Sequence, residues 1–173
     1  DIKLFYNDYN MFFTEKRQAA LALVESINTY AKDENGEYRK LIDGIGMQGY
    51  IGGYGKQQGC MNESDLGRIE TSIRMYADLG IEVHITEMAV RNYETDEATV
   101  AKHAAFCGKL FQVFKRVNAG DNKPLTCVAF WGIKDNPTPS DYSYRQNGPY
   151  CGLITENYEI KTSFDAIHAE MSK

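Results

Sequence analysis

The chain of 173 residues is long enough for one well-buried domain and too short for two comfortable ones. Its composition, with 43% hydrophobic and 25% charged residues, is ordinary for a globular protein, and its net charge of -5 provides no basic surface for nucleic acid. No apolar run approaches the length of a membrane span, so neither nucleic acid nor a membrane is expected as a partner.

The first predicted unit is a strand at residues 2–6 followed by a helix at residues 20–31, where apolar residues recur every three or four positions. Between the two lies a polar run: Asn7, Asp8, Tyr9 and Asn10. The first residue is Asp1, and the first strand begins directly after it. A natural gene product rarely opens inside its first core strand, so a leader and further sequence are expected upstream.

The second unit begins with a strand at residues 42–48, in which two glycines indicate close backbone packing. The glycine-rich segment at residues 49–59 lacks the spacing of a phosphate-binding loop, and we interpret it as a shaped loop that faces a ligand. Ser64 is predicted to cap a helix that ends at Gly80. The apolar face of this helix consists of Leu66, Ile69, Ile73, Tyr76 and Leu79.

The third unit contains the stretch on which the functional interpretation depends. Ile81, Val83 and Ile85 alternate with polar residues, which is the period of a strand, and Glu87 follows where this strand is expected to end. A carboxylate at the carboxyl end of a buried strand, in a chain of repeating strand–helix units, lies where barrel enzymes place their catalytic groups. The alternative is a glutamate whose side chain points from the end of the strand into water. The residues at the other strand ends must decide between these two interpretations.

In the last unit, Asp96 is predicted to cap a long helix that extends to Val117, and a fourth strand follows at residues 125–131. A polar loop at residues 132–149 contains three prolines and has a length typical of functional or disordered loops. The last helix is expected at residues 162–171.

Four strand–helix units at intervals of roughly forty residues predict an α/β fold with parallel strands. They make half of a (β/α)8 TIM barrel, which typically needs about 250 residues. An open sheet of four strands leaves its edges bare and one face uncovered. We therefore predict a half-barrel that needs a partner half to cover its open face and its edges.

Polar or aromatic residues stand at all four predicted strand ends: Asn7 with Tyr9, Gln48 with Tyr50, Glu87, and Trp131. Because the carboxyl ends of parallel strands share one edge, these groups predict a convergent polar site. A carboxylate supported by amides and flanked by aromatic rings suits glycoside hydrolysis. In that reaction the carboxylate attacks the anomeric carbon, amides hold sugar hydroxyls, and rings stack on the sugar faces.

The cysteines and histidines have no spacing typical of a metal site, and neither a metal nor a cofactor is predicted. Cys107 and Cys127 are interpreted as small core residues, whereas Cys60 and Cys151 lie in loops that could meet in a disulfide. The three histidines are interpreted as structural: His84, His103 and His168.

Four short stretches together point to a known family, and they are Tyr6-Asn7-Asp8-Tyr9-Asn10, Gly44-Ile45-Gly46-Met47-Gln48, Ile85-Thr86-Glu87 and Phe130-Trp131-Gly132. Each is weak alone, but the four occur in that family's order and spacing. Asn157-Tyr158 followed by Lys161 also fits. On these motifs the chain resembles the C-terminal half of a family-10 glycoside hydrolase, the endo-β-1,4-xylanases. The resemblance covers essentially the whole chain, as strands five to eight of the barrel.

The resemblance implies a single domain over residues 1–173 that belongs to a secreted or cell-surface enzyme. Its reaction would be the hydrolysis of internal β-1,4-xylosidic bonds in xylan or xylo-oligosaccharides. Glu87 would be the nucleophile of a retaining mechanism. Asn7, Gln48 and Trp131 would surround the sugar next to the scissile bond, and Tyr9 would lie near the leaving-group side.

The acid/base glutamate of the family is missing from these residues. In the family it ends strand four in a Trp-Asp-x-x-Asn-Glu setting, and no such motif occurs in this chain. A retaining glycosidase needs two carboxyl groups about 5–5.5 Å apart. The chain is therefore expected to be inactive alone and to require the missing N-terminal half as its partner.

The sequence departs from the family pattern at three places. Tyr50 stands where the family usually has histidine, and Ala89 stands where it usually has aspartate. In the family those two side chains belong to one hydrogen-bond network around the nucleophile, so we hypothesise that the Tyr50 hydroxyl reaches Glu87 and replaces the imidazole. Ser143-Tyr144 follows the Trp-Gly pair only after an insertion, and Tyr144 is expected to stack where a second tryptophan is usual.

Two other functions are open from the sequence. One is a non-catalytic half-barrel that binds carbohydrate or assembles with a copy of itself. The other is a different barrel β-glycanase, such as a β-glucanase or mannanase, which also uses a glutamate on strand seven. The Gly-Met-Gln and Asn-Asp-Tyr-Asn motifs favour the xylanase over this last group.

Overall fold

The computed structural model describes residues 2–53, 60–138 and 148–173. Within these ranges strands and helices alternate along the chain. The strands are β1 (Phe5–Asp8), β2 (Gly44–Met47), β3 (Tyr50–Ile51), β4 (Glu82–Val90) and β5 (Leu125–Phe130). The helices are α1 (Thr14–Asn28), α2 (Ser64–Ala77), α3 (Glu97–Val117) and α5 (Thr162–Met171).

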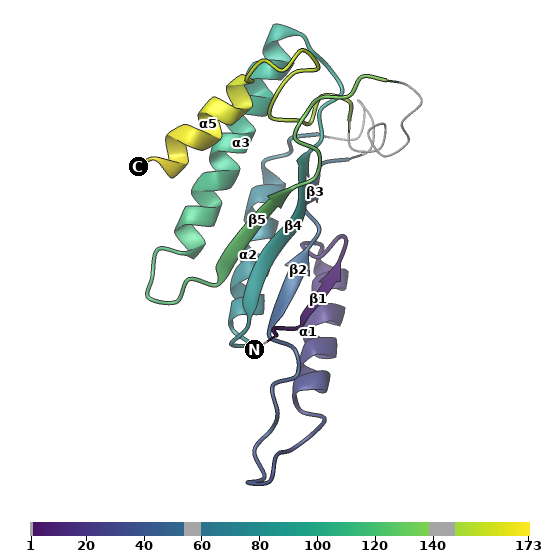
Figure 1. Cartoon of the computed structure of the whole chain (residues 1–173), viewed down its shortest axis with the longest axis vertical. Coiled ribbons are helices and arrows are strands. Elements are labelled where there is room, and N and C mark those ends of the chain that lie inside the picture. Colours follow the sequence, from purple (N-terminus) through teal and green to yellow (C-terminus); the bar gives the residue numbers. More distant parts are fainter. Residues whose placement is uncertain (1, 54–59, 139–147) are drawn as a thin grey trace.

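The strands of the described residues all pair in parallel. Their order is β1-β2-β4, with β5 on the outer side of β4. The two-residue β3 pairs with the end of β4, so it continues the line of β2 after a short break. Neighbouring helices contact one another in the same order, α1 with α2, α2 with α3, and α3 with α5 (Figure 1). The predicted parallel strand–helix units are confirmed, and consecutive units stand side by side, as in a segment of a barrel.

The hydrophobic core lies between the sheet and the helices. On β4, Val83 and Ile85 are at most 2% exposed and face the helix layer. His84 and Thr86, which alternate with them, are half-buried and face the other way. Burial of one such aliphatic side chain stabilises the fold by about 1.5–3 kcal/mol relative to exposure. One face of the sheet is therefore packed, and its opposite face is left open by the described residues.

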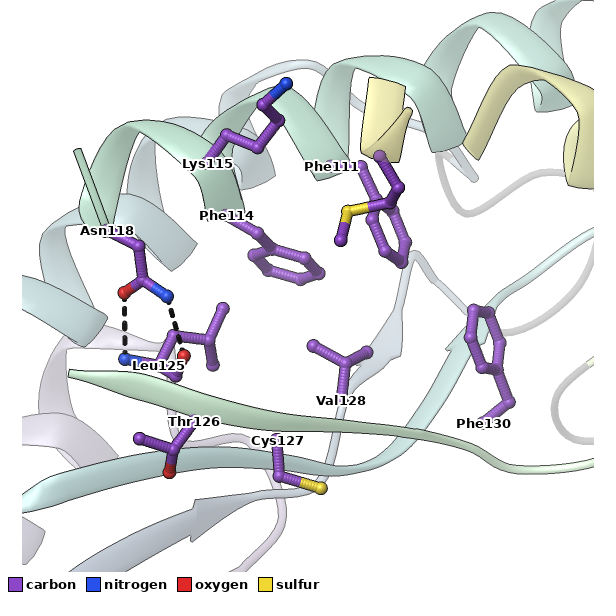
Figure 2. A pocket seen from close by; sticks show the side chains of 10 residues that line it. Phe111, Phe114, Lys115, Asn118, Leu125, Thr126, Cys127, Val128 and Phe130 are labelled. Carbon is purple, nitrogen blue, oxygen red and sulfur yellow. Dashed lines mark hydrogen bonds between the residues drawn. The ribbon is translucent and has the colours of Figure 1, made fainter. Parts of the chain in front are cut away.

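Both outer strands of the sheet have a free edge within the described residues, because β1 pairs with β2 and β5 pairs with β4. Beside β5, a cavity of about 400 Å³ opens between this strand, α3 and the end of α5 (Figure 2). Its walls are mostly apolar and include Phe111, Phe114, Val128, Phe130 and Met171.

The start of β5 is fastened to α3 by Asn118. This side chain donates to the carbonyl oxygen of Leu125 at 2.7 Å and accepts from the backbone N–H of Leu125 at 3.1 Å (Figure 2). The two bonds satisfy backbone groups of Leu125 just where α3 has ended and the strand begins. The wall of the cavity formed by β5 is therefore held in place at this end.

Several predicted boundaries are confirmed and others are wrong, among them the first helix, which was expected at residues 20–31 and spans Thr14–Asn28. Asp96 caps α3 by accepting from the N–H of Thr99 at 3.1 Å, and Gly80 ends the turn after α2 at φ 69°. β1 was expected at residues 2–6 but begins at Phe5 and includes Asn7 and Asp8, which were expected to follow the strand. Ser64 does not cap α2, because the preceding Glu63 already has helical backbone angles and Ser64 lies inside the helix.

Two expectations about cysteine need correction. Cys127 was interpreted as a core residue but is exposed, because its side of β5 is the open face of the sheet. Cys60 and Cys151 do not form a disulfide, and both are free thiols, Cys151 being buried. The Cys60 sulfur instead contacts the carbonyl oxygen of Gly53 at 3.4 Å. Among the described helices, none has both the length and the apolar content to cross a bilayer.

Candidate active site

The parallel register brings the carboxyl ends of the strands together at one edge. Three backbone hydrogen bonds beyond the regular pairing continue the sheet at this edge, from Gln48 to Asp8 at 3.0 Å, from Ala89 to Gly49 at 2.9 Å and from Trp131 to Met88 at 2.9 Å. Asn7, Gln48, Glu87 and Trp131 therefore lie on neighbouring strands toward the same edge of the sheet. The backbone thus directs the four strand ends to one edge, and a shared site formed by their side chains stays a prediction.

Glu87 lies within β4 rather than after its end, at an irregularity in the pairing with β5. Ile85 pairs with Val128 and Met88 pairs with Phe130, so three steps on β4 oppose two on β5. This extra residue is a β-bulge, which interrupts the strict alternation of side chains and can aim one of them away from the core. Thr86 and Glu87 are consecutive and both half-buried, whereas their neighbours Ile85 and Met88 are buried.

The Tyr50 hydroxyl donates a hydrogen bond to Oε2 of Glu87. Tyr50 opens β3, and its register partner on β4 is Ala89, two residues beyond Glu87. The predicted contact between the phenol and the carboxylate is therefore present. A hydrogen bond to a carboxylate is stronger than one between neutral groups, so it orients the side chain of Glu87.

The ring of Trp131 stands edge-on to the ring of Tyr50, with the ring centroids 6.5 Å apart and an interplanar angle of 81°. Trp131 is 45% exposed and packs against the ring whose hydroxyl binds Glu87, so part of its surface is open near this carboxylate. A large aromatic ring in this position offers an apolar surface next to an anionic group. This combination suits the face of a sugar ring and its reacting carbon.

Asn7 is oriented by Thr86, whose hydroxyl donates to Oδ1 of Asn7 at 2.7 Å. This contact fixes which branch of the carboxamide faces the sheet and leaves the NH2 branch on the other side. Thr86 was not identified from the sequence as a site residue. Its position directly before Glu87 gave a weak signal, but its contact with Asn7 depends on the pairing of the strands and on the glycine of β2 that lies between them.

Tyr9 stands apart from this group on the β1 side. Its backbone N–H donates to Oδ1 of Asp8 at 2.8 Å, and Lys16 lies 4.9 Å from the centre of its ring, which is largely exposed. Burial opposes ionisation of Asp8, but hydrogen bonds from Lys16 and Tyr6 outweigh it and lower the pKa of this carboxyl. Tyr9 therefore lies beside the ion pair of Asp8 and Lys16, and its contact with a sugar stays a prediction.

Gln48 is half-buried and is placed by its backbone bond to Asp8. Tyr144, which was predicted to stack on a sugar, lies outside the described residues. The group formed by Asn7, Gln48, Tyr50, Glu87 and Trp131 contains one carboxylate. Two-carboxylate chemistry therefore needs a second acid from elsewhere.

The segment that follows Trp131 is anchored by a buried ion pair between Asp135 and Lys161. Lys161 Nζ contacts both carboxylate oxygens, at 2.8 and 2.9 Å, and also donates to the carbonyl oxygen of Tyr150 at 2.8 Å. Oδ1 of Asp135 accepts from the N–H of Gly152 at 2.9 Å. These bonds join the chain after β5 to the start of α5 and restrict how far Trp131 can move.

The histidines make structural contacts. Nε2 of His103 donates to the carbonyl oxygen of Val90 at 3.1 Å, and burial lowers the pKa of His103 to about 4, so the ring is neutral. His84 stacks on Phe5 with the centroids 4.1 Å apart, and His168 stacks on Phe164. In residues 2–53, 60–138 and 148–173, no cluster of His, Cys, Asp or Glu is arranged to hold a metal ion.

Comparison with known proteins gives a consistent match. The model of "Glycosyl hydrolase family 10" matches residues 1–170. Endo-1,4-beta-xylanase A of Thermotoga neapolitana is 33% identical over 178 residues, which cover 96% of this chain and 14% of that protein. The chain thus spans a minor part of this relative.

Solved structures agree in fold. An intracellular xylanase from Thermoanaerobacterium saccharolyticum matches with a TM-score of 0.72 and 28% identity, covering 96% of this chain and 44% of that one. A Clostridium thermocellum xylanase complexed with xylohexaose matches with a TM-score of 0.68 and 27% identity, covering 95% of this chain and 28% of that one. The chain therefore spans less than half of each of these structures and has the fold of a partial α/β barrel.

Proposed function

The chain belongs to glycosyl hydrolase family 10, and from this premise we propose that it supplies half of the active site of an endo-1,4-β-xylanase. The reaction is the hydrolysis of internal β-1,4-xylosidic bonds with retention of configuration. Glu87 attacks the anomeric carbon and forms a glycosyl-enzyme, which water then hydrolyses. The observation that carries this proposal is the Glu87 carboxylate held by the Tyr50 hydroxyl beside the open ring of Trp131.

The other residues of the group have roles that follow from their chemistry. Asn7 and Gln48 provide amides, which can both donate to and accept from sugar hydroxyls. Trp131 provides a flat apolar surface for the ring of one xylose unit. Tyr9 borders the leaving-group side, where its exposed ring can meet the next sugar. Xylan or a xylo-oligosaccharide is the proposed substrate, and no cofactor is needed.

The acid/base is proposed to come from an N-terminal half-barrel. Protonation of the leaving group needs a second carboxyl about 5–5.5 Å from Glu87 in a retaining enzyme. Glu63 and Glu82 are poor candidates, because Glu63 pairs with Lys109 and Glu82 pairs with Lys3 at the other end of β4. A partner that closes the barrel over the open face of the sheet would bring its own carboxylate to the same edge.

The free edges of the sheet indicate where this N-terminal half would join. A barrel has no edge, so β1 and β5 would each pair with a strand of the partner. The cavity beside β5 in Figure 2 would then receive apolar side chains of the partner's adjoining unit, because Phe111, Phe114 and Phe130 line it. Burial of this surface would contribute to the association of the two halves.

The decisive experiment identifies the nucleophile in the full-length protein that carries this chain. A fluorinated xylobioside that forms a slowly hydrolysed glycosyl-enzyme should label Glu87, as read by mass spectrometry of the peptides. Glu87→Gln should abolish turnover while the binding of xylo-oligosaccharides survives. The matched control is Glu82→Gln in the same strand, which should retain turnover. A label on another residue, or normal rates in Glu87→Gln, would contradict the proposal.

A second function is favoured by the single carboxylate in the group. A half-barrel without a second acid would bind xylo-oligosaccharides at Trp131 and leave them intact. This outcome is distinguished by the same experiment, because binding would occur without labelling or cleavage in the unaltered protein.

We further propose that the protein acts outside the cell, either secreted or on the cell surface, since an intact xylan chain is too large to enter. Fractionation of the producing cells, with detection of this chain by antibody, tests the proposal. Recovery of the protein in the cytoplasm alone would contradict it.

A further inference from the structure

A buried cation lies behind the residue that holds Glu87. Arg91 is 4% exposed and follows the last residue of β4. Its guanidinium carbon is 5.8 Å from the centre of the Tyr50 ring. Nη1 of Arg91 donates to the carbonyl oxygen of Gly52 and lies 3.5 Å from the carbonyl oxygen of Tyr50. One side chain therefore contacts both the ring of Tyr50 and the backbone around it.

Tyr50 needs such support, because its own strand is short. β3 has two residues and pairs with β4 through Ala89 and Val90. Ala89 stands where the family pattern has an aspartate, and its methyl group cannot form a hydrogen bond to Tyr50. The ring of Tyr50 is thus held by Trp131 along one edge and by the charge of Arg91. A desolvated guanidinium is attracted to an aromatic ring more strongly than an exposed one.

The backbone at Gly52 is shaped to accept this cation. Gly52 has φ 104°, a region that side-chain-bearing residues rarely adopt. A Cβ atom on Gly52 would approach the Cα of Cys60 to 3.3 Å and the Cβ of Arg91 to 3.5 Å. The turn after β3 therefore packs closely around Arg91 and presents a carbonyl oxygen to it.

We propose that Arg91 is a positioning residue for the nucleophile and acts through Tyr50. The guanidinium fixes the ring of Tyr50, and the hydroxyl of that ring fixes the carboxylate of Glu87. In this arrangement Arg91 performs the orienting function that an aspartate at position 89 would otherwise share. The inference rests on the proposed role of Glu87, so it deepens the proposed function and is tested by two separate measurements.

The first measurement is a kinetic double-mutant cycle in the full-length protein. Arg91→Met retains the length of the side chain but removes its charge and donors, and Tyr50→Phe removes the hydroxyl. Each change is expected to lower kcat by about 10- to 100-fold with little change in KM, because a small displacement of the nucleophile has effects of this size. The double variant should be no slower than Tyr50→Phe alone, since both changes break one chain of contacts.

Two control variants separate this role from a general loss of structure. Arg91→Lys keeps the charge and should recover part of the lost rate, although it lacks the planar fork. Arg74→Met removes a surface arginine that pairs with Glu70, and it should leave kcat unchanged. Normal kcat in Arg91→Met would overturn the proposal. So would a double variant in which the decrease in kcat equals the product of the two single decreases.

The second measurement does not require turnover. Crystal structures of the unaltered protein and Arg91→Met should show the Tyr50 hydroxyl bonded to Glu87 in the first and beyond hydrogen-bond distance in the second. If the protein binds xylo-oligosaccharides without cleaving them, the proposed function fails but this comparison still decides the role of Arg91. An unchanged bond between Tyr50 and Glu87 in Arg91→Met would overturn the inference.

Discussion

Thr86 and Asn7 form a hydrogen bond of 2.7 Å across a strand that lies between them. Thr86 is on β4 and Asn7 is on β1, whereas β2 separates these two strands. The bond is formed because Gly46 of β2 has no side chain. A Cβ atom at Gly46 would lie 2.4 Å from Oδ1 of Asn7 and 2.9 Å from Cγ2 of Thr86.

Gly46→Ala is therefore expected to disrupt the site and the sheet together. The added methyl group must displace Asn7 or Thr86, which should lower the free energy of unfolding by about 1–3 kcal/mol. Urea denaturation monitored by circular dichroism measures this loss. Gly67→Ala in α2 is the control, because no atom lies within 4 Å of its added Cβ. The control should raise stability by about 0.5–1 kcal/mol, as alanine does inside a helix.

The buried imidazole of His103 makes stability depend on pH. Burial, with a smaller contribution from the charge of Lys161, lowers the pKa of His103 from 6.5 to about 4. Between these values the unfolded chain takes up a proton that the folded chain does not. The stabilisation is thus fully present above pH 6.5 and is lost as the pH falls through about 4, an expected loss of about 3 kcal/mol.

His103→Gln tests this dependence, because the amide can still donate to the carbonyl oxygen of Val90 but does not titrate. The unfolding free energies of the two proteins should converge as the pH is lowered from about 7 to about 4. Equal pH dependence of the two proteins would show that His103 is not the titrating group.

Trp131 is expected to contribute to sugar binding through its exposed surface. Trp131→Ala should weaken the binding of xylo-oligosaccharides by about 0.5–1.5 kcal/mol, which is about two- to tenfold in the dissociation constant. Isothermal titration calorimetry with Glu87→Gln as the background measures this effect without turnover. Tyr30→Ala is the matched control, since Tyr30 is 86% exposed and follows the end of α1. An equal loss of affinity in Trp131→Ala and Tyr30→Ala would contradict the placement of Trp131 in the site.

The accessibility of Cys127 reports on closure of the barrel. Its side chain is exposed and lies on the opposite side of β5 from Val128 (Figure 2). A thiol reagent should therefore modify Cys127 quickly in the isolated chain and at least about tenfold more slowly when the N-terminal half is present. Cys107 should resist in both states, because burial raises its pKa to about 12. Equal labelling of Cys127 in both states would contradict closure over this face.

Much of the fold follows from local patterns. The alternation of Ile81, Val83 and Ile85 predicted β4, and Asp96 predicted the start of α3. The contact between Tyr50 and Glu87 was predictable because Tyr50 and Ala89 differ together from the family pattern. In each case the signal lies in the identity and spacing of a few residues.

Other features depend on contacts that no local pattern contains. The bulge at Glu87 is defined only by the pairing of β4 with β5, and the Thr86–Asn7 bond requires the empty side of Gly46. Cys127 was misjudged because alternation shows which side of a strand a residue takes but not whether that side is covered. Arg91 was missed, although a charged residue directly after the buried end of a strand was a usable signal.

The extra residue in β4 limits which mutations this segment can accept. Deletion of one position between Ile85 and Met88 would restore the regular pleat and leave Met88 on the same buried face as Ile85, because the two would then be two positions apart, like Val128 and Phe130. The one residue left between them could not both orient Asn7, as Thr86 does, and carry the carboxylate of Glu87. A deletion in this segment would therefore remove a residue that the site uses. The chemistry around Glu87 can change only by substitution of single side chains.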